Sequence, residues 1–232
     1  MAVTRAEIVA TGLALLDEVG LAGLSLRRLA ERLQIRAPTL YWHVRDKREL
    51  LDLLAEAILA EALADWHQPQ PGQAWWEWLA ERSRALRSGL LAHRDRALVL
   101  SGRRPTPQSL PAIERQLSTL VGFGFTPRDA LLGVLSLSAF VIGDVLDVQG
   151  QLERARPEAS TDRASRRRPS ESDARGLRGY PVFDEAIDRV LRDDDPFAQR
   201  FEHGLGLLIA GMRASGPRPT PRPVEPASAG RS

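Results

Sequence analysis

The hydrophobic and polar positions along the chain follow a helical period almost throughout. In the first 65 residues the pattern predicts four helices. The first begins with a capping box after Thr4 and ends at Gly20, the second follows Ser25, Pro38 opens a very short third, and the fourth covers 47–64. Four helices therefore fill this first part of the chain.

A proline-rich and glutamine-rich break at 67–73 separates these helices from a longer helical region. Further helices are predicted at 74–92, 94–100, 108–122, 127–148, 181–192 and 196–214. No strand pattern competes with them, so we expect an all-α fold with an N-terminal domain at 1–64 and a larger helical domain at 65–214. A flexible loop is expected at 151–179, and the proline-rich tail at 215–232 should be disordered.

Composition narrows the class of protein. The 232 residues are 43% apolar, enough to build a core, and they include no cysteine, which excludes disulfides and thiolate metal sites. No signal peptide is evident, and no stretch approaches the roughly 20 apolar residues that cross a bilayer. We therefore expect a cytoplasmic protein. Its net charge is only +2, yet 24–48 carries seven basic and two acidic residues, a footprint that would attract a phosphate backbone.

The second and third predicted helices, joined by a tight turn, form the pattern of a helix-turn-helix. Leu40 and Val44 are spaced to face the core, which leaves small and aromatic polar groups outside. Ala37 and Thr39 can approach base edges, whereas Tyr41 and others can bind phosphate oxygens. The predicted DNA-binding residues are Leu26, Arg27, Arg28, Ala37, Pro38, Thr39, Tyr41, Trp42, His43 and Lys47.

These residues also have simpler interpretations. A run of arginines is usually just a solvated helix face. Trp42 can either take part in docking DNA or pack against the fourth helix, and the sequence leaves both open. Three exposed rings in one turn nevertheless favour a surface on which something docks.

The quoted blocks "LAERL", "PTLYWHV" and "DKRELLD" resemble, in order and spacing, the DNA-binding domain of the tetracycline repressor family. Further blocks such as "GFGFTPRDAL" and "FEHGLGLLIAGM" resemble the ligand-binding and dimerisation domain of the family's tetracycline repressor subclass, so that the likeness covers about 4–214. The resemblance implies a homodimeric repressor that binds a palindromic DNA operator and releases it when a small-molecule inducer binds. Leu26 and Ala37 depart from the threonine and glutamine of the family pattern, which predicts a changed operator preference.

The resemblance also implies a ligand site, and here the departures are larger. Its positions fall on Leu63, Arg82, Leu86, Leu100, Arg103, Gln116, Leu131 and Val134. Leucine replaces one tetracycline-contacting histidine and the metal-binding histidine, at positions 63 and 100, and leucine cannot ligate Mg²⁺. We therefore expect an inducer other than magnesium-bound tetracycline, an aromatic or antibiotic-like compound, with no cofactor and no metal.

The two arginines of this site have alternative interpretations. Arg82 and Arg103 either hold a carboxylate or phenolate of the ligand or form salt bridges to acids such as Glu77 and Glu114. Asp147 is a further candidate partner for one of these arginines.

Other conspicuous residues are given structural roles. Trp75, Trp76 and Trp78 are expected in core and interface packing. Small residues at 133, 136 and 143 and at 204 and 211 should let two helices approach closely in the four-helix bundle of a dimer. His93 and His203 look isolated, which gives a metal site little support.

An enzymatic function is not expected, because the sequence offers no nucleophile with a base, no paired catalytic carboxylates and no glycine-rich phosphate loop. The remaining alternative is an architectural or activating DNA-binding protein whose C-terminal domain only dimerises.

Overall fold

The computed structural model describes residues 3–102, 105–155, 180–191 and 194–217, and these residues form helices and connecting turns without any strand. The expectation of an all-α fold is confirmed. The helices are α1 (Arg5–Gly23), α2 (Leu26–Arg32), α3 (Ala37–Tyr41), α4 (Lys47–Ala62), α5 (Trp75–Leu91), α6 (Arg96–Leu100), α7 (Leu110–Gly122), α8 (Pro127–Ala155), α10 (Pro181–Leu191) and α11 (Pro196–Ser215). The predicted tail lies, from 218 onward, outside the described residues.

Local hydrogen bonds explain where the N-terminal helices begin. The Thr4 hydroxyl accepts from the Glu7 amide at 3.2 Å while the Glu7 carboxylate accepts from the Thr4 amide at 2.7 Å, which confirms the predicted capping box. Ser25 caps α2 in the same way. Gly20, at φ +70°, kinks α1 rather than ending it, and the helix runs on to Gly23.

Helix α8 is longer than predicted. The pattern suggested an end at Val148, whereas the helix continues to Ala155. Apart from Gly150, the added residues are good helix formers, and the Gln151 side chain donates to Asp147 one turn earlier at 2.9 Å. The first part of the expected flexible loop is thus helical, and its remainder, 156–179, lies outside the described residues.

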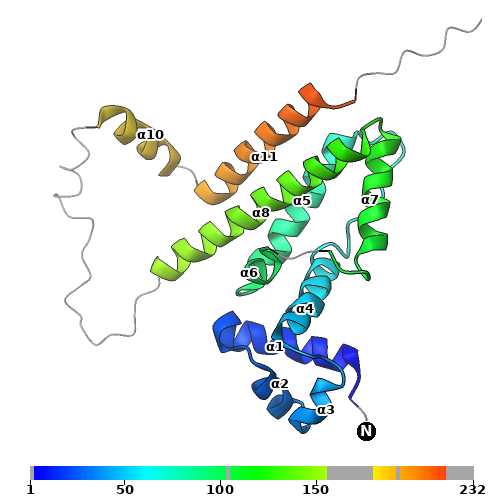
Figure 1. The fold of residues 1–232 in the computed structure, drawn as a ribbon. Helices are drawn as coiled ribbons and strands as arrows, with labels where there is room; N and C mark the ends of the chain where they lie inside the picture. The colour runs from blue at the N-terminus through cyan, green and yellow to red at the C-terminus, as the bar shows by residue number, and fades with distance from the viewer. Residues whose placement is uncertain (1–2, 103–104, 156–179, 192–193, 218–232) are drawn as a thin grey trace, which may run out of the picture.

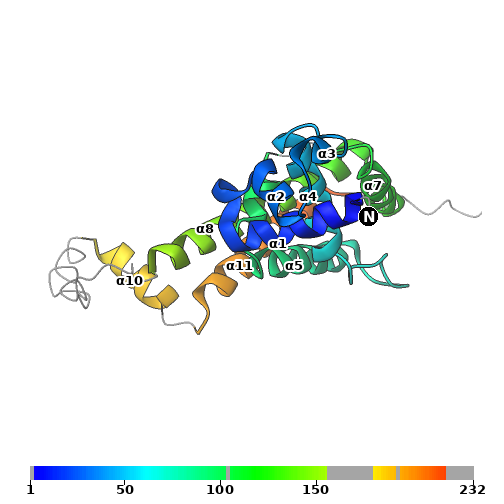
Figure 2. The same ribbon diagram turned by 90° about the horizontal axis from the view of Figure 1, so that it is seen from below.

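The helices build two connected units (Figure 1). Helices α1–α3 form a small unit at one end, and α5, α7, α8 and α11 form a larger one, with α8 in contact with the other three. Helix α4 runs from the first unit to the second and packs on α1, α5 and α6. Seen from below, α10 projects beside the ends of α8 and α11, away from α7 (Figure 2).

The contact between α4 and α5 depends on a glycine. A Cβ atom on Gly89 would lie 2.6 Å from the Cβ of Ala62 and 2.8 Å from its Cα. These two Ala62 atoms are a backbone atom and the first side-chain atom, so neither can move away by rotation of a side chain. The larger unit therefore meets α4 at its closest possible approach.

Small residues play a mixed role between α8 and α11. A Cβ atom on Gly133 would lie 2.4 Å from Met212, and one on Gly204 would lie 2.6 Å from Phe140, so these two glycines allow close approach within the chain. Gly143 and Gly211 have nothing within 4 Å and leave open surface instead. Trp75 and Trp78 are buried, as expected, while Trp76 is half-buried beneath Arg213.

The expectation that no segment is apolar enough to cross a bilayer was wrong, because one helix passes that test by length and composition. Within α8, Pro127–Arg154 is long and apolar enough, with a mean hydropathy of 2.0, and 39% of that window is buried in this chain. Such an apolar helix also suits the core of a helical bundle. The buried carboxylate of Asp144, paired with Arg87 at 2.7 Å, favours that second interpretation.

We predict that Gly89→Ala lowers the free energy of unfolding by about 1–3 kcal/mol, because the added methyl group forces α4 and α5 apart. Urea denaturation followed by circular dichroism measures the change. Gly122→Ala is the matched control, since nothing lies within 4 Å of its Cβ position, and it should change stability by less than about 0.5 kcal/mol. An equal effect of both substitutions would contradict the proposed contact.

Candidate DNA interface and ligand site

The turn between α2 and α3 has the local geometry of a helix-turn-helix. Gln34 adopts a left-handed conformation, φ +56°, and the amide of Ile35 donates to the carbonyl of Ala30 at 3.1 Å, closing the end of α2. Leu29 and Leu40 are buried where α2 and α3 meet. The predicted core role of Leu40 and Val44 is confirmed, since both are at most 1% exposed.

The residues predicted to contact DNA lie mostly on the outer face of this unit. Leu26 and His43 are half-buried, and Leu26 packs against the hydrophobic core. The others, Arg27, Arg28, Ala37, Pro38, Thr39, Tyr41, Trp42 and Lys47, are exposed. Most of the predicted set is thus exposed, while Leu26, on the apolar face of α2, also has a packing role.

Trp42 settles one of the open alternatives. Its side chain is 89% exposed, so it does not pack against α4. Together with Tyr41, 53% exposed, it forms an aromatic surface at the end of α3. An exposed indole of this kind gains nothing from solvent and favours a docking surface.

Several predicted DNA-binding cations already have partners within the chain. Arg27 pairs with Glu31 one turn later at 3.0 Å, and Arg28 donates to the carbonyl of Gly23 at 3.2 Å. Lys47 donates to the carbonyl of Leu21 at 3.2 Å. These exposed contacts are weak enough to be exchanged for phosphate oxygens.

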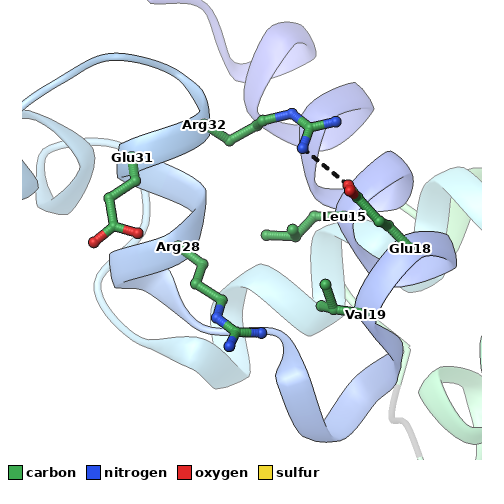
Figure 3. Close-up of a pocket in the computed structure, with 6 residues that line it drawn as sticks. All are labelled: Leu15, Glu18, Val19, Arg28, Glu31 and Arg32. Carbon is green, nitrogen blue, oxygen red and sulfur yellow. Dashed lines mark hydrogen bonds and ion pairs between the residues drawn. The ribbon is translucent and has the colours of Figure 1, made fainter.

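A shallow groove of about 340 Å³ lies between α1 and α2, beside the predicted DNA-binding face (Figure 3). Leu15 and Val19 form its apolar side, and Arg32 bridges across to Glu18 at 2.9 Å. Another groove, of about 370 Å³, runs between α5 and α11 along Trp76, Arg84 and Glu202. Neither groove is lined by a residue of the predicted ligand site.

The predicted ligand-binding residues lie mainly inside the larger unit. Arg82 and Leu86 on α5, Leu100 on α6, Gln116 on α7 and Val134 on α8 are all buried. Among the rest, Leu63 is half-buried at the end of α4, Leu131 is 40% exposed on α8, and Arg103 lies outside the described residues.

Arg82 is buried without a counter-charge. Only 7% of the residue is exposed, and no ion pair joins it to any acid in the described part of the chain. Glu77 instead caps α5, and Glu114 accepts from Ser118, so neither forms the salt bridge with Arg82 that was considered from sequence. Desolvation lowers the pKa of Arg82 to about 10, which still leaves a cation at neutral pH.

The considered ion pair between Asp147 and Arg82 is not formed either. Asp147 pairs with Arg200 of α11, and this contact lowers the pKa of the Asp147 carboxyl. Arg200 reaches Asp144 as well, at 2.8 Å, and Asp144 also binds Arg87. These ion pairs tie α5, α8 and α11 together, a structural role invisible in sequence because the partners are 53 to 57 positions apart.

The junction between the two units contains a charged cluster that we call the Arg96 cluster: Asp17 of α1, Glu61 of α4, His93 and Arg96. The Arg96 guanidinium, almost fully buried, donates to Glu61 at 2.8 Å and to Asp17 at 3.1 Å. His93 lies 2.9 Å from Asp17 and 3.5 Å from Glu61, so the expectation that it is isolated was wrong. The cluster fastens α6 to both α1 and α4.

The comparisons with known proteins identify the family. The family described as bacterial regulatory proteins, tetR family, matches residues 8–54, and the tetracyclin repressor-like C-terminal domain matches 68–215. The class D tetracycline repressor of Escherichia coli is 38% identical over 208 residues, 90% of this chain and 88% of that protein. The chain belongs to the TetR family.

Solved structures of TetR-family proteins resemble this one over almost their whole length. ActR from Streptomyces coelicolor, in complex with actinorhodin, matches with a TM-score of 0.71 and 33% identity, covering 93% of this chain and 98% of that one. The class A tetracycline repressor, in complex with 5a,6-anhydrotetracycline and magnesium, matches with a TM-score of 0.64 and 30% identity, covering 93% and 100%. The expected helix-turn-helix regulator is therefore confirmed, and it belongs to a family of transcriptional regulators, not of enzymes.

We predict that Arg96→Met lowers the free energy of unfolding of this TetR-family protein by about 1–3 kcal/mol, because it leaves two acids at the junction without their buried partner. Partial exposure of Glu61 keeps the loss at the lower end. Arg32→Met is the control: it removes an exposed ion pair between α1 and α2 and should cost less than about 1 kcal/mol. Chemical denaturation of both variants checks the difference, and equal losses would contradict the role of the cluster.

Proposed function

We propose that the protein is a cytoplasmic, homodimeric repressor that binds a palindromic operator through α3 and releases it when a small molecule binds inside the larger unit. The observation that carries this proposal is α3 itself: a five-residue helix, anchored by buried Leu40, whose remaining side chains face solvent beside a basic helix. That arrangement fits the insertion of a recognition helix into a major groove.

Dimerisation is supported by apolar surface that the chain leaves uncovered. On α8, Leu131, Leu132 and Leu135 are each at least 40% exposed, and Leu207 of α11 is 63% exposed. Gly143 and Gly211 leave room for another helix on the same two elements. A two-fold dimer would cover these residues and present two copies of α3 to half-sites one DNA turn apart.

The residues present do not fit magnesium-bound tetracycline. Leu63 and Leu100 stand where the family resemblance places ligand-contacting and metal-binding histidines, and a leucine side chain offers no oxygen or nitrogen to a metal ion. The described residues contain no group of three or more acidic or histidine side chains able to hold one. We therefore propose an inducer that binds without a metal, in a site lined mostly by apolar groups.

Helix α6 is placed to carry the effect of a ligand to the DNA-binding unit. Its last residue, Leu100, belongs to the predicted ligand site, while its first, Arg96, is bound to α1 and α4. A ligand that displaces α6 would therefore move α4 and change the spacing of the two recognition helices. Such a ligand must bind the non-operator conformation more tightly, because only differential affinity shifts the equilibrium.

The proposal is tested by a footprint of the purified full-length protein on the DNA around its own gene. We expect protection of a palindrome whose half-sites are about 10 base pairs apart from centre to centre. The absence of any protected palindrome would contradict the repressor proposal. Small molecules are then added to the bound complex, and failure of every candidate to release the DNA would favour an architectural protein whose second domain only dimerises.

We predict that two substitutions on α3 separate gripping DNA from reading it. Tyr41→Ala should weaken binding to all operators by a similar factor, about 3- to 10-fold, because a phosphate contact carries no sequence information. Ala37→Gln should instead change the order of operator preference, since glutamine can bind adenine in the groove. A binding selection from randomised DNA measures both, with Arg128→Ala on α8 as control, and the reverse pattern would show the division to be wrong.

A further inference from the structure

Among the described residues, Arg82 differs from buried Arg96 and half-buried Arg87 in forming no ion pair with an acid. Arg96 binds two acids and Arg87 binds Asp144, whereas the Nε of Arg82 lacks a hydrogen-bond partner among the residues that the structure describes. It makes a cation–π contact with Trp66, whose ring centre lies 5.7 Å from the guanidinium carbon. A cation–π contact offsets only part of the cost of burying a charge, so the free protein carries an incompletely compensated cation.

A second buried polar group, Gln116, is also unsatisfied. The residue is 6% exposed, and its side-chain nitrogen has no partner in the described ranges. Gln116 lies on α7, one turn before Thr119, whose hydroxyl donates to Gln68 at 2.7 Å. Since Trp66 contacts Arg82, the segment at 66–68 lies against both α5 and α7, the two helices that carry the unsatisfied groups.

The remaining surroundings are apolar and aromatic. Trp66 stacks on Trp78 with 4.7 Å between ring centres, and Leu86 follows Arg82 one turn later on the buried face of α5. Buried polar groups in native proteins are normally paired, and unpaired ones need a physical explanation. A bound ligand that brings an anion and a flat ring would satisfy the cation, the amide and the aromatic surface together.

We propose that Arg82 and Gln116 form the polar end of the inducer site and that the inducer is an aromatic organic acid, held by its carboxylate directly on the guanidinium. This inference rests on the proposed function, because it deepens the inducer site named there. The anion would replace the missing counter-charge, and Gln116 would donate to a second oxygen of the ligand. Recognition through a charged side chain takes the place of recognition through a chelated metal.

The test uses the full-length protein and a matched pair of probes, anthraquinone-2-carboxylate and its neutral carboxamide, in isothermal titration calorimetry at pH 7. We expect the carboxylate to bind at least about tenfold more tightly, as a charge-assisted hydrogen bond predicts. Arg82→Met should abolish the preference while leaving carboxamide affinity within about threefold, and Arg82→Lys should keep part of it. Arg84→Met is the control on the same helix, since its guanidinium is exposed and paired with Glu202.

A second measurement needs no ligand. If Arg82 is uncompensated in the free protein, Arg82→Met should raise the melting temperature by several degrees, on the order of 5 °C. A lower melting temperature, equal affinity of the wild type for both probes, no binding of the carboxylate, or a preference that survives in Arg82→Met would each overturn the inference.

Operator binding by the same variants keeps the two proposals apart. Arg82→Met should still protect the operator, because Arg82 lies outside the DNA-binding unit. Intact operator binding with no anion preference would remove only the inference about the ligand. A clear anion preference in a protein that protects no DNA would remove only the repressor proposal.

Discussion

Helix α4 belongs to two packed cores at once, and the rest of the molecule depends on this double burial. Near its start, Leu50 and Leu54 lie so close to α1 that a methyl group on Gly12 would reach 2.9 Å from Leu54. Near its end, Ala62 meets Gly89 of α5 at a distance that admits no side chain. Closely packed interiors do not deform continuously, so α4 cannot tilt against α5 without also moving α1, and with it the helix-turn-helix.

The arginines buried in the core differ in whether they hold helices together. Arg96 and Arg87 each join helices by pairing with acids, one at the junction of the two units and the other within the larger unit. Both are compensated, and both restrict the movement of the helices that they join. Arg82 is buried about as deeply as Arg96, but it forms no ion pair with any described residue and so restrains no helix in this way. A cation kept in this state costs stability, which is a cost expected at a binding site and not in a structural core.

The sequence predicted most of the fold because the signals that start helices are local. Thr4, Ser25 and Pro196 mark helix starts through hydrogen bonds or ring geometry within a few residues, and these starts agree with the structure. The misses came from long-range contacts. His93 looked isolated because its partners, Asp17 and Glu61, lie on other helices. The end of α8 was misplaced for a local reason, because Gly150, a residue type that often marks a helix end, is accommodated inside the helix. The burial of Arg82 could be anticipated from the family resemblance, but its lack of a partner depends on where every nearby acid points.

Helix α8, which is apolar enough to resemble a membrane span, has two sides that suit a helix inside a protein assembly. One side of α8 buries Asp144 in ion pairs with α5 and α11, an arrangement that a lipid-facing helix would not need. The other side exposes Leu131, Leu132 and Leu135, a contiguous apolar surface that is costly in water. In the proposed dimer, a second copy of the chain would satisfy both sides at once, because it would cover the leucines without disturbing the ion pairs behind them. Since α5, which carries Arg82, packs directly on α8, the buried cation lies one helix away from the proposed dimer interface. A ligand that neutralises this cation would then affect the structure in two directions. One leads through α8 to the partner subunit, and the other leads through α6 and α4 to the DNA-binding unit.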